Sequence, residues 1–432
     1  MSSKENNNKK TMGLWSATSI GVGAMIGAGI FALIGIAVQI AGQLAYVSFI
    51  IAGIIAAFTS YSVSKLAVKF PSKGGRVEYL NRAFGKGIFA GGLNITIWLG
   101  YTIVTALYAK AFSEYAAALL GMQGHSLFLS LMSIAIVALF IFINFAGSAL
   151  VGKSELVTVI AKIGILLLFC ILGFTTVQSS ELSVSKSFDF ADVMFASGVI
   201  FMSYEGFGLV ANTAEDVRKP SKNLPKALFL SICIVMLVYI LTSVVVIGNL
   251  SIPEILKAKE YVLAEAARPL LGEIGFDIMA IAALFSTASA INATIYGPVN
   301  MVHETAKANQ LPSFLVKKIF NHKSGIALLV TGGLVILITI TLDLEAIAEV
   351  GSLVFLMIYT LVNIANFKLR RKTKSKAWLV VLGIAGTSFA FAALFYHELQ
   401  KQSLSLYVFF GLVLLCFIYE WIFQRKNLKN QD

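Results

Sequence analysis

The stretch GVGAMIGAGIFALIG at residues 21–35 is the part of the chain from which the fold can be worked out. Five of its fifteen residues are glycine, and each glycine in a helix interior costs about 1 kcal/mol relative to alanine. The stretch nevertheless lies in an apolar run with no charged residue between Thr11 and Ser64, which is the pattern of a membrane span. It predicts a helix that is interrupted within the membrane, or one that contacts another helix closely through the G-x-x-x-G pair Gly23 and Gly27.

The composition of the whole chain predicts an all-α integral membrane protein. Of 432 residues, 58% are hydrophobic and 13% are charged, and the mean hydropathy is +0.83. Soluble chains are typically about 45–50% apolar and about 25% charged. The first twelve residues are polar and basic, without the cleavage site of a secretory signal.

The positive charges indicate the orientation in the membrane rather than a nucleic-acid partner. The net charge is +12, and the basic residues gather at residues 65–86, 218–226 and 368–376. The loops between these clusters, such as GMQGHS at 121–126 and LDLEA at 342–346, hold almost none. This alternation follows the positive-inside rule. We therefore expect a multi-pass protein of the plasma membrane of a prokaryote, embedded in the lipid bilayer with both termini in the cytoplasm.

Twelve apolar runs are long enough to span a bilayer. They lie at about 13–39, 43–68, 86–119, 127–147, 151–177, 190–214, 225–249, 274–304, 325–341, 346–366, 377–396 and 404–424. The first and sixth runs are both rich in glycine, and the sixth, FASGVIFMSYEGFGLVANTAEDVRKP at 195–220, holds a glutamate. Glycine-interrupted spans at matching places in two halves are typical of secondary transporters built from inverted repeats.

This spacing predicts how the chain is organised. We expect a cytoplasmic tail at 1–12, a first five-helix repeat at 13–177 and an inverted second repeat at 190–366. Two appended spans at 377–424 and a cytoplasmic tail at 425–432 would follow. Unwinding near Ala24–Gly29 would aim the N-terminus of a half-helix at the bilayer centre, where it could bind a carboxylate.

The two glycine-rich spans resemble those of the amino acid–polyamine–organocation superfamily of permeases. The resemblance rests on the first span, on SYEGFG at 203–208 and on AEDVRKPSKNLPKAL at 214–228, and runs from about Trp15 through the tenth span. It implies a LeuT-like core, alternating access, and an amino acid whose carboxylate binds first-span amides and whose amine binds sixth-span carbonyls. The substrate-binding residues expected from it are Ala24, Met25, Ile26, Gly27, Ala28, Gly29, Phe201, Met202, Ser203, Tyr204 and Glu205.

Within the superfamily the chain looks closest to proton-coupled, sodium-independent transporters, and Lys162 is the decisive residue. Lys162 lies roughly 16 Å along the fifth span, near mid-membrane, where a charge is costly and is functional by default. The resemblance implies that its ammonium replaces a sodium ion and contacts the backbone of Gly23 and the hydroxyl of Ser286, with Ser289 a weaker candidate. Because burial disfavours the charged form, Lys162 could exchange a proton. It could also snorkel or pair structurally.

The sixth span departs from the family pattern at three places. Met202, beside Phe201, stands where many members carry an aromatic gate, and Gly208 stands where an acid is frequent. Glu205 instead places an acid inside the expected unwound stretch. It could bind a cationic side chain or an α-ammonium group, or transfer protons. It could equally be protonated, or satisfied by a neighbouring group.

Other classes of function find little support in the residues. No H-E-x-x-H or G-x-S-x-G motif indicates an enzyme, and no repeated filter sequence indicates a channel. The histidines and the three cysteines lack ligand spacing, so no metal or cofactor is expected. No obligatory protein partner is evident, since no cysteine lies in an outward loop to link one, although a transporter that depends on an accessory subunit stays open. An exchanger or a sodium-coupled carrier on the same scaffold stays open, although Lys162 argues against sodium at the site it would occupy.

Overall fold

A computed structural model describes residues 11–27, 29–146, 151–183, 189–307, 310–319 and 324–429. These residues form helices joined by short connections, and an isolated parallel bridge joins Met12 to Val217. The expected all-helical class is confirmed.

The helices have the following bounds. In chain order they are α1 (Leu14–Met25), α2 (Gly29–Ala41), η1 (Gly42–Leu44), α3 (Ala45–Lys69), α4 (Arg76–Phe84), α5 (Ile88–Leu119), α6 (Ser126–Ala146), α7 (Val151–Gly173), α8 (Phe190–Ile200), η3 (Phe201–Tyr204), α9 (Phe207–Asn212), α10 (Pro220–Asn249), α11 (Ile252–Lys257), α12 (Val262–Lys307), η4 (Ser313–Val316), α13 (Gly325–Thr341), α14 (Leu344–Lys368), α15 (Arg370–Thr373), α16 (Ala377–Lys401) and α17 (Leu404–Lys429).

The lengths and exposed surfaces of these helices fit a bilayer. Within the described residues, nine helical stretches are long and apolar enough to cross a membrane, and Thr158–Gly173 and Gly325–Thr341 are shorter apolar helices. Large apolar side chains such as Leu127, Phe142 and Ile171 are exposed on the outer helices, as lipid-facing side chains are. The count of twelve spans stays a prediction.

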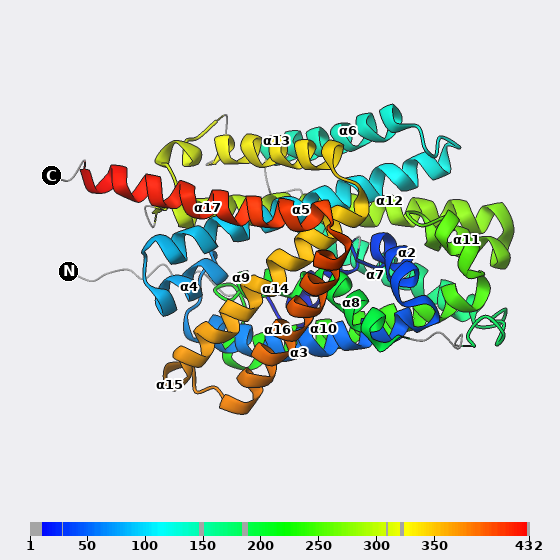
Figure 1. The fold of residues 1–432 in the computed structure, drawn as a ribbon, viewed down its shortest axis with the longest axis horizontal. Coiled ribbons are helices and arrows are strands. Elements are labelled where there is room, and N and C mark those ends of the chain that lie inside the picture. The colour runs from blue at the N-terminus through cyan, green and yellow to red at the C-terminus, as the bar shows by residue number, and fades with distance from the viewer. Residues whose placement is uncertain are drawn as a thin grey trace.

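Helices that would correspond in two repeats pack against each other. α3 packs along α10, α5 along α12 and α6 along α13, while α1 contacts α9 and α2 contacts α8. Figure 1 shows α6 and α13 side by side along one edge, with α17 crossing α5 below them. This pairing favours the inverted-repeat layout.

Basic loop segments and the chain ends gather at one end of the molecule. In Figure 1, α4, α15 and the C-terminal end of α17 lie at the left, whereas α11 lies at the right. The bridge between Met12 and Val217 ties the start of the described chain to the loop after α9. This shared end agrees with the orientation expected from the basic loops.

Two helices begin five or more residues before the expected start, for physical reasons. α10 begins at Pro220, five residues before the expected start at 225, because proline suits the first position of a helix. α12 begins at Val262 instead of near 274, since the chain forms an additional outer segment that kinks at Leu271 and Gly272. Gly272 has φ 63°, a conformation that glycine adopts readily.

Candidate functional site

The first span is broken where the glycines predict it. α1 ends at Met25, Ile26 leaves the helix with ψ 33°, and α2 begins at Gly29. Unwinding within 24–29 is thus confirmed, although Ala24 and Met25 are still helical. Ala28, an expected substrate-binding residue, lies outside the described residues. The break leaves first-turn amides of α2 without partners inside that helix.

The sixth span is interrupted by a 3₁₀ turn but does not unwind as expected, since the backbone at Phe201, Glu205 and Gly206 stays right-handed helical. α8 ends at Ile200, a single 3₁₀ turn covers Phe201–Tyr204, and α9 starts at Phe207. The backbone continues through i→i+3 hydrogen bonds, such as the one from Glu205 N to Met202 O at 3.1 Å. Hydrogen bonds in such tight turns have poorer geometry than those of an α-helix, and this backbone is buried within the protein, where a departure from α-helix is tolerated.

The two breaks contact each other through glycine. A Cβ atom on Gly206 would lie 2.5 Å from the backbone nitrogen of Met25, so only glycine fits there. From α10, the Tyr239 hydroxyl donates to Met25 O at 2.6 Å and lies 3.2 Å from Ser203 O. One tyrosine therefore links both broken spans at their carbonyls.

Lys162 lies beside the first break. Its side chain is 4% exposed, and its Nζ donates to the backbone carbonyl of Ser286 at 3.2 Å. The Ser286 hydroxyl donates to Ile26 O at 2.5 Å, in the broken stretch. The structure brings Lys162 and Ser286 together as expected, but through the Ser286 carbonyl, while the hydroxyl reaches the first span. Gly23 is buried in α1, and its contact with Lys162 stays a prediction.

Glu205 pairs with an arginine from a loop helix. Arg76 Nη1 on α4 lies 2.7 Å from Glu205 Oε1, and the two side chains are 1% and 2% exposed. The same nitrogen donates to the Tyr359 hydroxyl at 2.7 Å, and the guanidinium lies over the Tyr101 ring at 5.0 Å. Of the interpretations left open by the sequence, the structure supplies a neighbouring group for Glu205 Oε1, while Oε2 receives no hydrogen bond from the described part of the chain; a contact with substrate stays a prediction.

Gly208 leaves room for the guanidinium of Arg76 and for the hydroxyl of Tyr359. A Cβ on Gly208 would lie 2.7 Å from Arg76 Nη2 and from the Tyr359 hydroxyl. The Arg76 guanidinium thus occupies the space beside Gly208, and Glu205, three residues earlier in the chain, supplies the negative charge.

The remaining expected residues of the sixth span are buried in protein contacts. Phe201 packs edge-on against Tyr359 with ring centroids 5.9 Å apart. The Ser203 hydroxyl donates to Ile200 O at 2.6 Å, and the Tyr204 hydroxyl donates to Phe49 O at 2.9 Å. Met202 is 2% exposed. These contacts shape the centre of the molecule, while the role of these residues in binding substrate stays a prediction.

At the opposite end, Glu345 connects three elements. Its carboxylate accepts from Lys259 Nζ at 2.6 Å and from Gln39 Nε2 at 3.4 Å, and lies 3.7 Å from Lys401 Nζ. Gln39 belongs to α2, the second half of the broken first span. Glu345 therefore ties α14 to α2, the second half of the first span.

Sequence reasoning missed the partners that hold this site. Arg76 was visible only as one of several basic loop residues, and Tyr239 and Tyr359 stood out in no motif. The bonds from Arg76 to Glu205 and from Tyr239 to Met25 join residues 129 and 214 positions apart. No periodicity within one span can reveal such pairs.

This architecture defines a class of protein. A broken first span that meets a 3₁₀ turn of the sixth span at a buried polar centre is typical of a secondary transporter. The chain belongs to the amino acid permease family, whose model matches residues 12–419.

Several relatives are similar over nearly the whole chain. The uncharacterised protein MJ0609 of Methanocaldococcus jannaschii is 37% identical over 98% of both chains. The inner membrane transport protein YbaT of Escherichia coli is 32% identical over 99% of both. The serine/threonine exchanger SteT of Bacillus subtilis is 24% identical over 94% of this chain and 96% of its own. The protein is therefore an amino acid transporter of the membrane and not an enzyme.

One stretch of the chain matches a phosphate-binding motif, but its place in this fold does not support that function. GSALVGKS at 147–154 fits the pattern G-x-x-x-x-G-K-[ST], which binds phosphate when it follows a strand. Here the helix α6 precedes it and α7 begins within it. The match therefore does not identify a phosphate site.

Proposed function

We propose that the protein is a proton-coupled amino acid symporter that works by alternating access, with Lys162 in the place of a coupling sodium ion. The observation that carries the proposal is the chain of contacts from Lys162 Nζ to Ser286 O, and from Ser286 Oγ to Ile26 O. It joins α7 and α12 to the break in the first span.

The chemistry of lysine accounts for the coupling. A protonated ammonium has three donors and a full charge, and it attracts the carbonyls freed at the broken span. Loss of the proton removes that charge and one donor, so the contacts between α7, α12 and the first span weaken. The binding state of the proton and the position of the first span are then linked.

The substrate is proposed to bind between the two breaks. Its carboxylate would face the amides at the start of α2, where the helix dipole favours a negative charge. Its ammonium would face the carbonyls at the end of α8 and in η3. The proposed lining residues are those at 24–29 and 201–205, with Glu205 acting directly on substrate only if it leaves Arg76.

Contacts on both sides of the centre support alternating access. The pair Arg76–Glu205 closes one end of the molecule, and Glu345 with Lys259 and Gln39 closes the other. The proposed organisation is two inverted repeats at 13–177 and 190–366 and two further spans at 377–424. Both termini would face the cytoplasm across a plasma membrane, because the basic segments lie at their end.

Exchange of amino acids is the second candidate. SteT is 24% identical to this chain and is by its name a serine/threonine exchanger, so a relative at this level of sequence identity is an exchanger. An exchanger would move labelled substrate only against unlabelled substrate on the other side. A symporter would accumulate substrate when a pH gradient is imposed.

The test is uptake of radiolabelled amino acids into proteoliposomes under an imposed pH gradient without sodium. Wild-type protein is expected to accumulate substrate, and Lys162→Ala is expected to lose accumulation while keeping counterflow. Lys110→Ala is a matched control, because Lys110 also lies in a span and donates to a backbone carbonyl, Thr339 O, at 3.4 Å, but that carbonyl belongs to α13 and not to the contacts at the first break. It should accumulate substrate as wild type does.

Three results would contradict the proposal. Accumulation that requires sodium would favour a sodium-coupled carrier. Counterflow without gradient-driven accumulation in wild type would favour an exchanger. Accumulation by Lys162→Ala at the wild-type level would make Lys162 a structural residue.

A further inference from the structure

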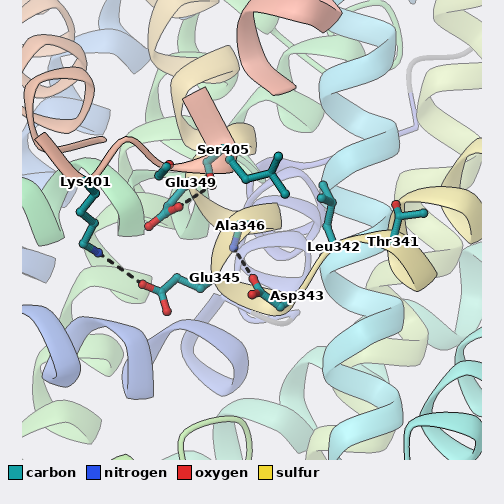
Figure 2. Close-up of a pocket in the computed structure, with 10 residues that line it drawn as sticks. Thr341, Leu342, Asp343, Glu345, Ala346, Glu349, Lys401 and Ser405 are labelled. Carbon is teal, nitrogen blue, oxygen red and sulfur yellow. Dashed lines mark hydrogen bonds and ion pairs between the residues drawn. The ribbon is translucent and has the colours of Figure 1, made fainter. Parts of the chain in front are cut away.

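A cavity opens at the end of the molecule where α14, α16 and α17 meet. Its volume is about 260 Å³, and its polar lining includes Asp343, Glu345, Glu349, Lys401, Ser403 and Ser405. Figure 2 shows Glu349 and Glu345 on the same side of α14, with Ser405 and Lys401 facing them. In the proposed orientation this cavity faces the outside of the cell.

Two carboxyl groups are buried next to this cavity. Glu349 on α14 is 4% exposed and Glu398 on α16 is 0% exposed. The Ser405 hydroxyl donates to Glu349 Oε2 at 2.6 Å, and the Ser403 hydroxyl donates to Glu398 Oε2. Ser403 lies in the connection between α16 and α17, and Ser405 lies in the first turn of α17, so this end of α17 holds both carboxyl groups.

If both carboxyl groups were ionised, one of their oxygens would lack a hydrogen-bond donor. They lie on the packed helices α14 and α16, bind serines only two positions apart in the chain and interact with each other, and Glu398 Oε1 receives no hydrogen bond from the described part of the chain. A buried carboxylate oxygen without a donor is costly, and two like charges in contact repel. A single proton shared between the carboxyl groups removes both costs.

The surrounding charges do not supply that donor. Lys401 reaches Glu345 Oε1 at 3.7 Å, and Lys259 reaches Glu345 Oε2 at 2.6 Å. Asp343 accepts from Ala346 N at the start of α14. His397 stacks on Phe195 at 3.4 Å, and its Nε2 is without a hydrogen-bond partner among the described groups. The lysines are thus directed to Glu345, one helical turn from Glu349.

We infer that Glu349 and Glu398 form a site that binds one proton, loaded from the outer solution through the cavity. With the proton bound, the pair is a single negative charge that joins α14 to α16. Without it, a second charge lies one turn from Glu345, which holds Lys259 and Gln39. External pH would then change the stability of the contact that ties α14 to the outer half of the first span.

Infrared spectroscopy tests the site without relying on transport. Purified full-length protein in nanodiscs is titrated from acidic to alkaline pH, and the stretching band of protonated carboxyl groups is followed. Wild type is expected to show a band that is lost as the pH rises. Glu349→Gln and Glu398→Gln are each expected to lack that component. Glu420→Gln removes another buried carboxyl group, bonded to Gln424 at 2.6 Å, and should keep it.

The outcomes distinguish failure of the carboxyl site from failure of the proposed coupling at Lys162. Only the role of the site in transport rests on the proposed function. A band unchanged in both glutamine variants would overturn the site, as would a band removed by added sodium at constant pH. If the coupling proposal alone fails, the band persists while Lys162→Ala accumulates substrate. If the carboxyl site alone fails, the band is unaffected by the variants while Lys162→Ala loses accumulation.

A second measurement tests what the proton does. Counterflow is measured at varied external and constant internal pH. Wild-type counterflow is expected to change with external pH, and Glu398→Gln, whose amide supplies a permanent donor, is expected to keep its acidic-pH value throughout. A wild-type pH profile retained in Glu398→Gln would overturn the role assigned to the pair.

Discussion

Arg76 and Glu205 form a buried ion pair, with Nη1 and Oε1 2.7 Å apart, that joins the loop helix α4 to the broken sixth span. The pair is enclosed by aromatic rings, since the guanidinium lies 5.0 Å from the ring centres of both Tyr101 and Tyr359. Because both charges are almost completely removed from water, removing either one leaves the other as an uncompensated buried charge.

Removing one partner of this pair should destabilise the protein strongly. Glu205→Gln leaves a buried guanidinium without its counter-charge, which costs about 3–5 kcal/mol. Arg76→Gln should have a similar effect. The double variant Arg76→Gln/Glu205→Gln should be less destabilised than the sum of the single variants, because no unpaired charge remains. Thermal unfolding of the purified variants measures these differences.

The neighbouring pair Arg82–Glu78 on the same helix is the control. It is also close, at 2.6 Å, but its side chains are 53% and 32% exposed. Exposed pairs contribute about 0–1 kcal/mol, so the same substitutions there should change the unfolding temperature little. Additive effects at Arg76 and Glu205 would contradict the dependence of one charge on the other.

The hydroxyl of Ser286 should matter for the position of the first span. Ser286→Ala removes the bond to Ile26 O but keeps the backbone carbonyl that accepts from Lys162. We expect a loss of about 0.5–1.5 kcal/mol in stability and weaker binding of amino acids, measured by thermal unfolding and by substrate titration. The broken stretch would be held less firmly.

Thr287 gives a matched control for Ser286. Its hydroxyl bonds to Ala283 O within its own helix, so Thr287→Val removes a hydroxyl without breaking a contact between helices. Its substrate affinity should stay near that of wild type. Equal losses of affinity in Ser286→Ala and Thr287→Val would show that the contact with Ile26 has no special role.

Gly206 should not tolerate even a methyl group. A Cβ at this position would lie 2.5 Å from Met25 N, so Gly206→Ala must push the two broken spans apart. We expect loss of transport together with a lower unfolding temperature, since overpacking typically costs about 1–3 kcal/mol. Uptake in proteoliposomes and thermal unfolding measure the two effects.

Gly164 on α7 is the comparison for Gly206. A Cβ there meets nothing within 4 Å, so Gly164→Ala should be neutral or slightly stabilising in a helix. Full transport by Gly206→Ala would sink the idea that the two breaks must touch.

Much of the architecture could be predicted from the residues alone. The break at Ile26 follows from glycines in a run without charges, and the turn at Phe201–Tyr204 follows from the matching sixth span. Lys162 could be selected because a charged side chain at mid-membrane depth is costly. Its proximity to Ser286 was expected from the resemblance, yet the atom that accepts its hydrogen bond could not be.

The sequence by itself determined the class, because hydropathy, charge and glycine content act along the chain and are readable span by span. Only the tertiary structure decided which polar groups satisfy each other. Glu205 meets Arg76, Tyr239 meets Met25 and Glu349 lies beside Glu398 because helices distant in the chain pack together. Inside a membrane protein a polar group must find its partner wherever the packing places one, and that choice is made in three dimensions.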